Sequence, residues 1–281
     1  MDQGSEGYAK DLIFRIKANQ LVRLLAYPYC VYQRNSRTRN YRHSEHSRRI
    51  RAWKNAFRGE RCFIIGNGPS LRAEDLEMLN ANHVMTFASN RIYHMYEMTD
   101  WRPDFYVAFE PEFCRTNADL ISQIEVRRAR FLNCAAWDSK RERGDSFWLN
   151  CTTRYSLKKL TTENIEFSED VSACVNDAYS VTYTIFQLAF YMGFSEIFLL
   201  GIDHYDRKVD PEAQHFYCKD RTEYQTPTFI EGIEAGYRAV RAEADRRGIR
   251  IYNATRGGKL ELFERVNLED AVGAVRNTNV K

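Results

Sequence analysis

The hydrophobic positions of this chain form two alternating patterns from residue 59 onward. Apolar runs without polar alternation, typical of strands buried on both faces of a parallel sheet, occur at residues 62–65, 84–88, 105–109, 131–134, 197–200 and 250–252, with a weaker run at 147–149. Helical spacing predicts helices over 73–80, 115–123, 181–191 and 229–247, and Gly193 and Gly248 follow the last two. The alternation predicts an α/β fold with a mostly parallel sheet flanked by helices.

The first 58 residues follow a different pattern. Apolar residues near helical spacing between residues 8 and 27 are interleaved with Lys and Arg, which predicts a basic amphipathic helix. Residues 34–61 contain ten Lys or Arg and two Glu, a local charge of +8 in a chain whose net charge is +3. We therefore expect residues 1–58 to form a basic helical extension and residues 59–281 to form the catalytic domain. The extension either lies on an anionic membrane surface, or packs on the domain with the Arg-rich stretch as a solvated connector.

Composition narrows the class of protein. The chain is 44% hydrophobic and 28% charged, which is usual for a globular domain, and no run approaches the roughly 20 apolar residues that span a bilayer. No secretory signal pattern is visible at the start. The seven cysteines include no Cys-x-x-Cys pair, which favours reduced thiols over a disulfide framework or a zinc site. We expect a cytoplasmic protein, peripheral on the inner membrane face if the extension binds lipid, and no nucleic-acid partner because no recognised module is present.

The strongest chemical signal follows the first apolar run. Gly66 and Gly68 permit close backbone approach, and Ser70 is placed to cap the next helix, so the turn predicts amides that attract an anion. Asn67 adds a side-chain amide between the glycines. No Lys-Ser/Thr pair follows, which excludes a Walker loop, and the third glycine of the dinucleotide fingerprint is missing. The turn predicts a nucleotide or sugar-nucleotide site; a purely structural turn is the alternative.

Other predicted strands also end in polar residues. In an open α/β sheet the ligand lies beyond the carboxyl ends of the strands, so these positions are expected to meet in one composite site. The polar strand ends are Ser89, Asn90 and Arg91; Glu110 and Glu112; Asp203, His204, Tyr205 and Asp206; and Asn253, Thr255 and Arg256.

Several of these segments together resemble a known family. The pieces at 59–71, 89–93, 201–205, 215–216 and 252–258 resemble the MptE-like family, a former domain of unknown function named after an archaeal 6-hydroxymethylpterin diphosphokinase. The pieces at 66–71 and 189–205 are also similar to bacterial CMP-sialate-dependent sialyltransferases. The resemblance implies a Rossmann-like domain that transfers a sugar, such as a sialic acid, from a CMP-type donor to a glycan or protein acceptor in surface-glycan assembly. Because a CMP donor carries a single phosphate, no metal cofactor is expected.

The resemblance also implies residue roles. Asn67 and Ser70 would meet the donor nucleotide or its phosphate, and Asn90 would approach from the next strand end. Tyr205 would support the departing phosphate, and His215 would be the general base that takes a proton from the acceptor hydroxyl. The remaining candidates are Gly66, Gly68, Asp203, His204 as the reserve base, Ser180, Thr182, Tyr217, Tyr224, Asn253 and Thr255.

The likeness to the sialyltransferases departs at two positions. In the sialyltransferases the histidine stands nearer the following helix, at the place where this chain has residues 224–226. Their serine before the penultimate helix falls at Val181 in this chain, and Ser180 and Thr182 stand on either side of it.

Two other functions remain open. Pyrophosphoryl transfer from ATP would need Mg²⁺ held by carboxylates, for which the candidates are Asp203, Asp206, Glu110 and Glu112, although no Walker lysine is present. A non-catalytic nucleotide-binding or membrane-docking module is the third possibility. We make no prediction of the oligomeric state.

Overall fold

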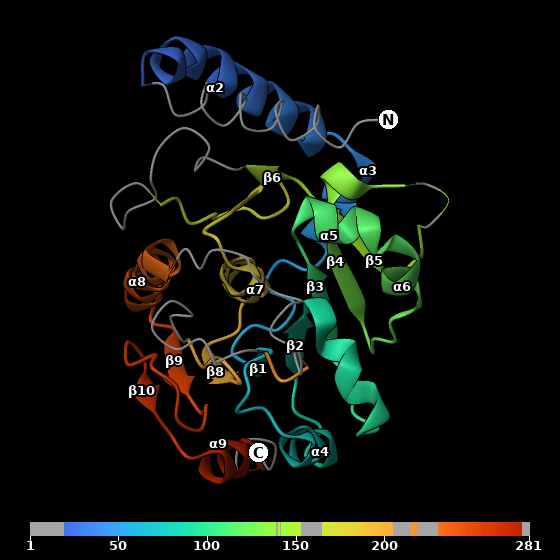
Figure 1. Cartoon of the computed structure of the whole chain (residues 1–281), viewed down its shortest axis with the longest axis vertical. Helices are drawn as coiled ribbons and strands as arrows, with labels where there is room; N and C mark the ends of the chain where they lie inside the picture. The colour runs from blue at the N-terminus through green and yellow to red at the C-terminus, as the bar shows by residue number, and fades with distance from the viewer. Residues whose placement is uncertain are drawn as a thin grey trace, which may run out of the picture.

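The computed structural model describes residues 20–138, 140, 142–152, 165–204, 215–217 and 230–276. Within them, eight strands form one sheet in the order β10-β9-β8-β1-β2-β3-β4-β5, in which every neighbouring pair is parallel (Figure 1). The strands of this sheet are β1 (Arg61–Ile65), β2 (Thr86–Ser89), β3 (Phe105–Ala108), β4 (Ala129–Asn133), β5 (Ser146–Leu149), β8 (Glu196–Leu200), β9 (Arg250–Asn253) and β10 (Glu264–Arg265). A separate pair joins β6 (Cys151–Thr152) to β7 (Val175–Asn176). The predicted Rossmann-like α/β fold is confirmed.

The described helices connect and cover these strands. They are α2 (Gln20–Arg42), α3 (Glu45–Arg51), α4 (Ala73–Ala81), η1 (Asn90–Glu97), α5 (Pro111–Thr116), α6 (Ala118–Gln123), η2 (Cys134–Ala136), α7 (Val181–Met192), α8 (Ile230–Arg247) and α9 (Leu268–Arg276). The single helix predicted over 115–123 is wrong: α5 ends and α6 begins around Asn117, whose backbone leaves the helical region. The 3-10 helix η1 and helix α9 were not predicted.

The sheet divides the hydrophobic core into two layers. Successive residues of a strand point to opposite faces, so Cys62 and Ile64 pack in one layer, and Phe63 and Ile65 pack in the other. The first layer is covered by α7 and α8, and the second by α4, η1 and α9 (Figure 1). Helix α7 is buried along almost its whole length, as expected for a helix lying across the centre of a sheet.

The N-terminal segment is helical over the Arg-rich stretch. Helices α2 and α3 span the Arg-rich stretch, in which Arg39, Arg42 and Arg48 are exposed. Tyr41, Ile50 and Phe57 belong to the same core layer as α7, and the Tyr41 hydroxyl donates to the Trp148 carbonyl oxygen in β5. The described part of the predicted extension therefore shares a core with the sheet. None of the helices in the described ranges is both long and apolar enough to cross a membrane.

Candidate functional site

The strand order places a switch point at the end of β1. From β1 the chain builds β2, β3, β4 and β5 outward on one side, whereas β8, β9 and β10 lie on the other side. The carboxyl ends of β1 and β8 therefore flank the crevice in which ligands of doubly wound sheets bind. The residues after these two strands were predicted to carry the site.

The two glycines after β1 bring the ends of β1 and β8 together. Gly66 N–H donates to Leu200 O (2.8 Å) and Gly68 N–H donates to Gly201 O (2.9 Å). A Cβ at Gly66 would lie 2.3 Å from Gly201 O, and one at Gly68 would lie 1.7 Å from Asp203 Oδ2. The glycines are thus required for the two loops to pack on each other, where the sequence had suggested room for a ligand.

Ser70 bonds to Asp203 and does not cap the next helix. Its Oγ donates to Asp203 Oδ2 (2.9 Å), and its amide lies 3.4 Å from the same oxygen. Helix α4 begins three residues later with Arg72 at its N-cap, whose amide donates to Asp75 Oδ2 (3.3 Å). The expectation that this turn presents free amides to an anion is therefore wrong for Gly68, Ser70 and Arg72, because the chain's own oxygens accept from them.

Asp203 is buried in this arrangement, with 3% of its surface exposed. Burial raises the pKa of its carboxyl, and the hydrogen bonds from Ser70 oppose that rise. The turn after β9 closes over it, because Lys259 N–H donates to Asp203 O (2.7 Å) and a Cβ at Gly258 would lie 2.8 Å from that oxygen. Asp203 therefore holds three loops together.

Asn67 has a side-chain oxygen that no described residue satisfies. Its Nδ2 donates to Ser89 O (3.1 Å) at the end of β2, which sets the amide orientation, since Oδ1 in that place would face another acceptor. The Oδ1 atom is buried and has no hydrogen-bond partner. The backbone oxygen of Asn67 accepts from Phe216 N–H (3.1 Å) and lies 3.2 Å from His215 Nδ1.

Asn90 has a second oxygen of the same kind. It begins η1 with φ of 50°, in the left-handed region that Asn tolerates better than most residues. Its backbone oxygen accepts from the Tyr106 hydroxyl (2.7 Å), and its side-chain Oδ1 is buried without a partner among the described residues. Two unsatisfied amide oxygens thus lie at the ends of neighbouring strands β1 and β2.

Residues 215–217 lie against this part of the site. The His215 and Tyr217 rings stack with centroids 5.1 Å apart, and Tyr217 also stacks on His94 of η1 at 5.3 Å. The Arg91 guanidinium carbon lies 5.9 Å from the Tyr217 ring centroid. Arg91 is one of the polar strand ends expected in the composite site, although no role was predicted for it, and His94 was not predicted.

The reserve base His204 lies toward α8. Its Nε2 is 3.7 Å from Glu234 Oε1, and its ring meets the Tyr237 ring edge-on at 5.4 Å. Ser180 and Thr182 hydrogen-bond the buried Tyr237 hydroxyl, whose pKa burial raises to about 12. The structure thus brings His204, Ser180 and Thr182 together around Tyr237, and it joins His215 and Tyr217 with Asn67 instead.

Asn253 and Thr255 use their side chains inside the protein. Asn253 Nδ2 donates to Leu260 O (2.9 Å), its Oδ1 accepts from Thr255 N–H (3.0 Å), and Thr255 Oγ1 accepts from Ile202 N–H (3.1 Å). These bonds tie the ends of β8 and β9 together. The predicted Tyr205, Tyr224 and Asp206 lie outside the described residues.

The carboxylates suggested for Mg²⁺ are engaged where they are described. Asp203 accepts from Ser70, and Glu110 caps α5 by accepting from the amides of Glu112 and Phe113. Within the described ranges, no three His, Cys, Asp or Glu side chains are grouped as metal ligands.

Sequence comparison identifies the family. The family model described as 6-hydroxymethylpterin diphosphokinase MptE-like matches residues 35–208, more than half of the chain. The chain belongs to the MptE-like family. The MptE-like match contains Asn67, Asn90 and Asp203 and ends before His215. None of the curated proteins compared with the chain matches it.

One solved structure has a similar arrangement. This is the structure of MAf glycosyltransferase from Magnetospirillum magneticum AMB-1, with a TM-score of 0.49 and 17% sequence identity. The similarity covers 83% of this MptE-like chain and 42% of that chain, so the present chain corresponds to less than half of the larger protein. Similarity at this level does not extend to chemistry.

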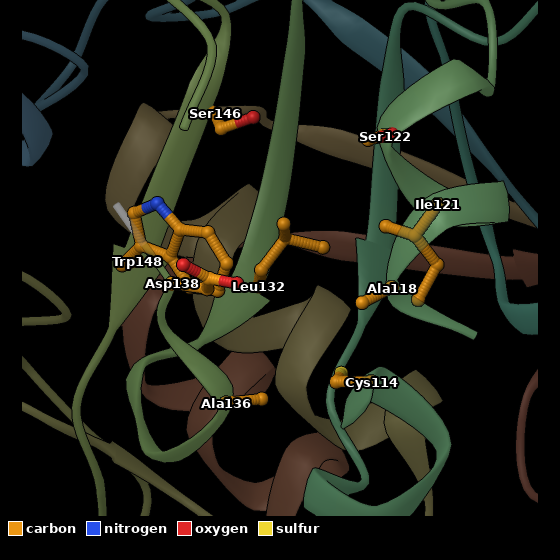
Figure 2. A pocket seen from close by; sticks show the side chains of 9 residues that line it. All are labelled: Cys114, Ala118, Ile121, Ser122, Leu132, Ala136, Asp138, Ser146 and Trp148. Atoms are coloured by element: carbon orange, nitrogen blue, oxygen red, sulfur yellow. The ribbon is translucent and has the colours of Figure 1, made fainter. Parts of the chain in front are cut away.

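A small pocket elsewhere in this MptE-like protein is not a second site. It lies by β4, β5, α5 and α6, and Figure 2 shows its lining, including Cys114, Leu132 and Trp148. Its volume of about 20 Å³ holds a single water molecule at most. The Trp148 Nε1 is buried there without a partner.

Proposed function

We propose that the chain is a transferase that binds a nucleotide-activated donor at the switch point between β1 and β8. The observation that carries the proposal is a pair of buried oxygens, Asn67 Oδ1 and Asn90 Oδ1, for which the described part of the chain provides no donor. A buried polar atom without a partner costs about 1–3 kcal/mol, and a ligand that donates hydrogen bonds to two such neighbouring atoms would remove that cost.

These oxygens define which part of a donor would lie against them. An amide oxygen only accepts hydrogen bonds, whereas phosphate oxygens are themselves acceptors. The groups that suit Asn67 and Asn90 are therefore hydroxyl or amino groups, as found on a ribose, a sugar or the exocyclic nitrogen of a base. This revises the predicted role of Asn67, because its side chain suits the nucleoside or sugar better than the phosphate.

The phosphate and the reacting hydroxyl would face the neighbouring side chains. Arg91 supplies a positive charge near Tyr217, and this pair suits the negative charge that develops on a leaving nucleotide. His215 suits the role of general base. The backbone oxygen of Asn67 lies next to its Nδ1, and this acceptor requires Nδ1 to carry the proton. The neutral imidazole then has its basic lone pair on Nε2, which would accept the proton of the acceptor hydroxyl.

The preferred reaction is glycosyl transfer from a CMP-type donor to a glycan or protein acceptor in the cytoplasm. Such a donor carries one phosphate and can leave without a metal, which agrees with carboxylates that are already engaged: Asp203 by Ser70, and Glu110 by the start of α5. The proposed donor sugar is of the sialic acid type, and the proposed acceptor is a hydroxyl of a glycan or a protein.

Pyrophosphoryl transfer from ATP is the second candidate. The description of the MptE-like family favours it, because it names a 6-hydroxymethylpterin diphosphokinase. This reaction would need Mg²⁺ and would give the opposite metal dependence from the CMP reaction.

Thermal unfolding of the full chain with CMP, CDP, UDP, GDP or ATP, each with and without Mg²⁺, tests both reactions. A ligand at a hundred times its Kd stabilises the folded state by about 2.7 kcal/mol, which raises Tm by several degrees. Stabilisation by CMP without metal is the expected result. Stabilisation by ATP with Mg²⁺ alone would select the diphosphokinase, and no response to any nucleotide would contradict both.

Asn90→Gly tests the site itself. Glycine accepts the positive φ of Asn90, so we expect the free energy of unfolding to change by less than about 1 kcal/mol. Loss of the Oδ1 acceptor should weaken CMP binding by about tenfold, measured by calorimetry. His83→Gly is the matched control, because His83 also has positive φ (52°) but lies after α4. Equal affinities in the two variants would remove Asn90 from the site.

A further inference from the structure

A second surface with distinct chemistry lies between α2 and α3. An open groove of about 950 Å³ is lined by five arginines, and no carboxylate is among the described residues that line it. These arginines are Arg34, Arg39, Arg42, Arg48 and Arg51. So dense a group of one sign creates a local positive potential that attracts an anionic partner.

Within the described ranges, four of the five arginines form no ion pair. Arg34 lies 3.4 Å from Glu166, and Arg51 donates to Ser47 Oγ (3.2 Å) and to the backbone oxygen of Arg42. Arg39, Arg42 and Arg48 are exposed, and their side chains form no ion pair with any residue in the described ranges. Their guanidinium groups are therefore available to an external partner.

Helix α2 joins this charge to exposed aromatic residues. Tyr29 and Tyr32 are 65% and 67% exposed, and their spacing of three residues puts them on one face of α2. The 23 residues of the helix include no Asp or Glu. Figure 1 shows α2 at the end of the molecule opposite α4 and α9. Tyrosine next to arginine is the combination found where helices lie at a lipid–water interface.

We propose that α2 and α3 dock this protein on an anionic phospholipid surface. The guanidinium groups of Arg39, Arg42 and Arg48 bind headgroup phosphates, which their planar forks match with two hydrogen bonds. Tyr29 and Tyr32 lie at the level of the headgroups. The tyrosines favour a lipid surface over a free anion, because a free anion would need the charge alone. This proposal is independent of the reaction at the switch point.

Vesicle flotation with the full chain tests the proposal. Wild type should bind vesicles of phosphatidylcholine and phosphatidylglycerol in equal amounts, bind phosphatidylcholine vesicles weakly, and lose binding as salt is raised. Replacing Arg39, Arg42 and Arg48 with Ala should lower binding on the order of a hundredfold, since each basic residue near such a surface contributes several-fold. The matched control replaces Lys54, Arg58 and Lys140 with Ala. These residues are exposed and lie outside the groove, so the control removes the same amount of charge from another part of the surface.

A second variant separates charge from interfacial contact. Replacing Tyr29 and Tyr32 with Ser should lower binding several-fold and leave its salt dependence unchanged. Equal binding by the arginine variant and its control would overturn the proposal, as would equal binding of wild type to neutral and anionic vesicles. Release of vesicles by inorganic phosphate at constant ionic strength would assign the groove to a free phosphoanion. Release by an oligonucleotide would assign it to nucleic acid.

Discussion

At the scale of single residues, the loops after β1 and β8 depend on two glycines and on one buried carboxylate. Gly66 and Gly68 admit the backbone of the β8 loop, and Asp203 fills the space between the two loops while accepting from Ser70. The same contacts place Asn67 against the end of β2. The same contacts therefore pack these loops and orient the candidate site. A substitution that disturbs them should lower the free energy of unfolding.

Gly66→Ala should destabilise the fold by about 3 kcal/mol, because overpacking against an immobile backbone costs roughly 1–3 kcal/mol or more. The new Cβ would lie 2.3 Å from Gly201 O, which cannot move without shifting β8. Urea denaturation measures the difference. Gly144→Ala is the control, because no atom lies within 4 Å of a Cβ at Gly144. The steric explanation fails if both variants lose the same stability.

The buried carboxyl of Asp203 predicts a dependence of stability on pH. Its pKa is raised in the folded state, so the folded protein binds the proton more tightly than the unfolded chain. The contribution of Asp203 to stability should therefore fall as pH rises from about 3.9, the ordinary Asp value, to the raised pKa, with a slope of at most about 1.4 kcal/mol per pH unit.

Asp203→Asn lacks this proton equilibrium. The difference in unfolding free energy between Asp203→Asn and wild type should move in favour of the variant across that acidic window and stay constant above it. Urea denaturation of both proteins over a pH series measures the difference, in which the titrations of all other groups cancel. A difference that does not change with pH would show that the Asp203 pKa is not raised.

At the scale of elements, helix ends account for several of the predicted site residues. Ser180 is the N-cap of α7, and its side chain accepts from Thr182 N–H (3.2 Å). Glu110 has the same role at the start of α5. Residues with short polar side chains suit both ligand binding and capping, so the residue type alone cannot separate the two roles.

Ser180→Ala should lower the free energy of unfolding by about 1 kcal/mol, because it removes the cap of a buried helix. Its effect on nucleotide affinity should be small, since the Ser180 side chain bonds within α7 and to Tyr237. Thermal unfolding with and without CMP measures both quantities. Ser180→Asp retains a capping oxygen and should recover most of the lost stability. Loss of CMP binding at normal stability would instead place Ser180 in the binding site.

At the scale of the whole molecule, the N-terminal helices and the sheet share one core. Ile50 of α3 is fully buried in the layer that contains α7, and residues 55–59 hydrogen-bond to the end of α7 through Tyr191, Met192 and Gly193. A part of the chain connected in this way should unfold together with the sheet.

Ile50→Ala should destabilise the whole protein by about 2–5 kcal/mol, the usual cost of such a cavity. Circular dichroism and tryptophan fluorescence should report one coincident transition at lower temperature, because α3 has no separate core. Leu120→Ala, at a side chain that is 39% exposed, is the control and should change stability by about 0.5 kcal/mol. Two separate transitions would mean that the N-terminal helices unfold independently.

The sequence determined the parallel sheet, because strands buried on both faces leave apolar runs such as that of β1 that can be recognised locally. It also determined that Asn67 and Asn90 follow neighbouring strands. Strand β10 was missed because both of its residues are exposed, whereas α9 was missed although Leu268, Ala271 and Val272 are buried in the core. Only the tertiary structure decided that Asp203 accepts from Ser70, 133 residues before it, and that no described residue donates to Asn67 Oδ1. Hydrogen-bond partners of this kind come together by folding, and no local pattern of residues specifies them.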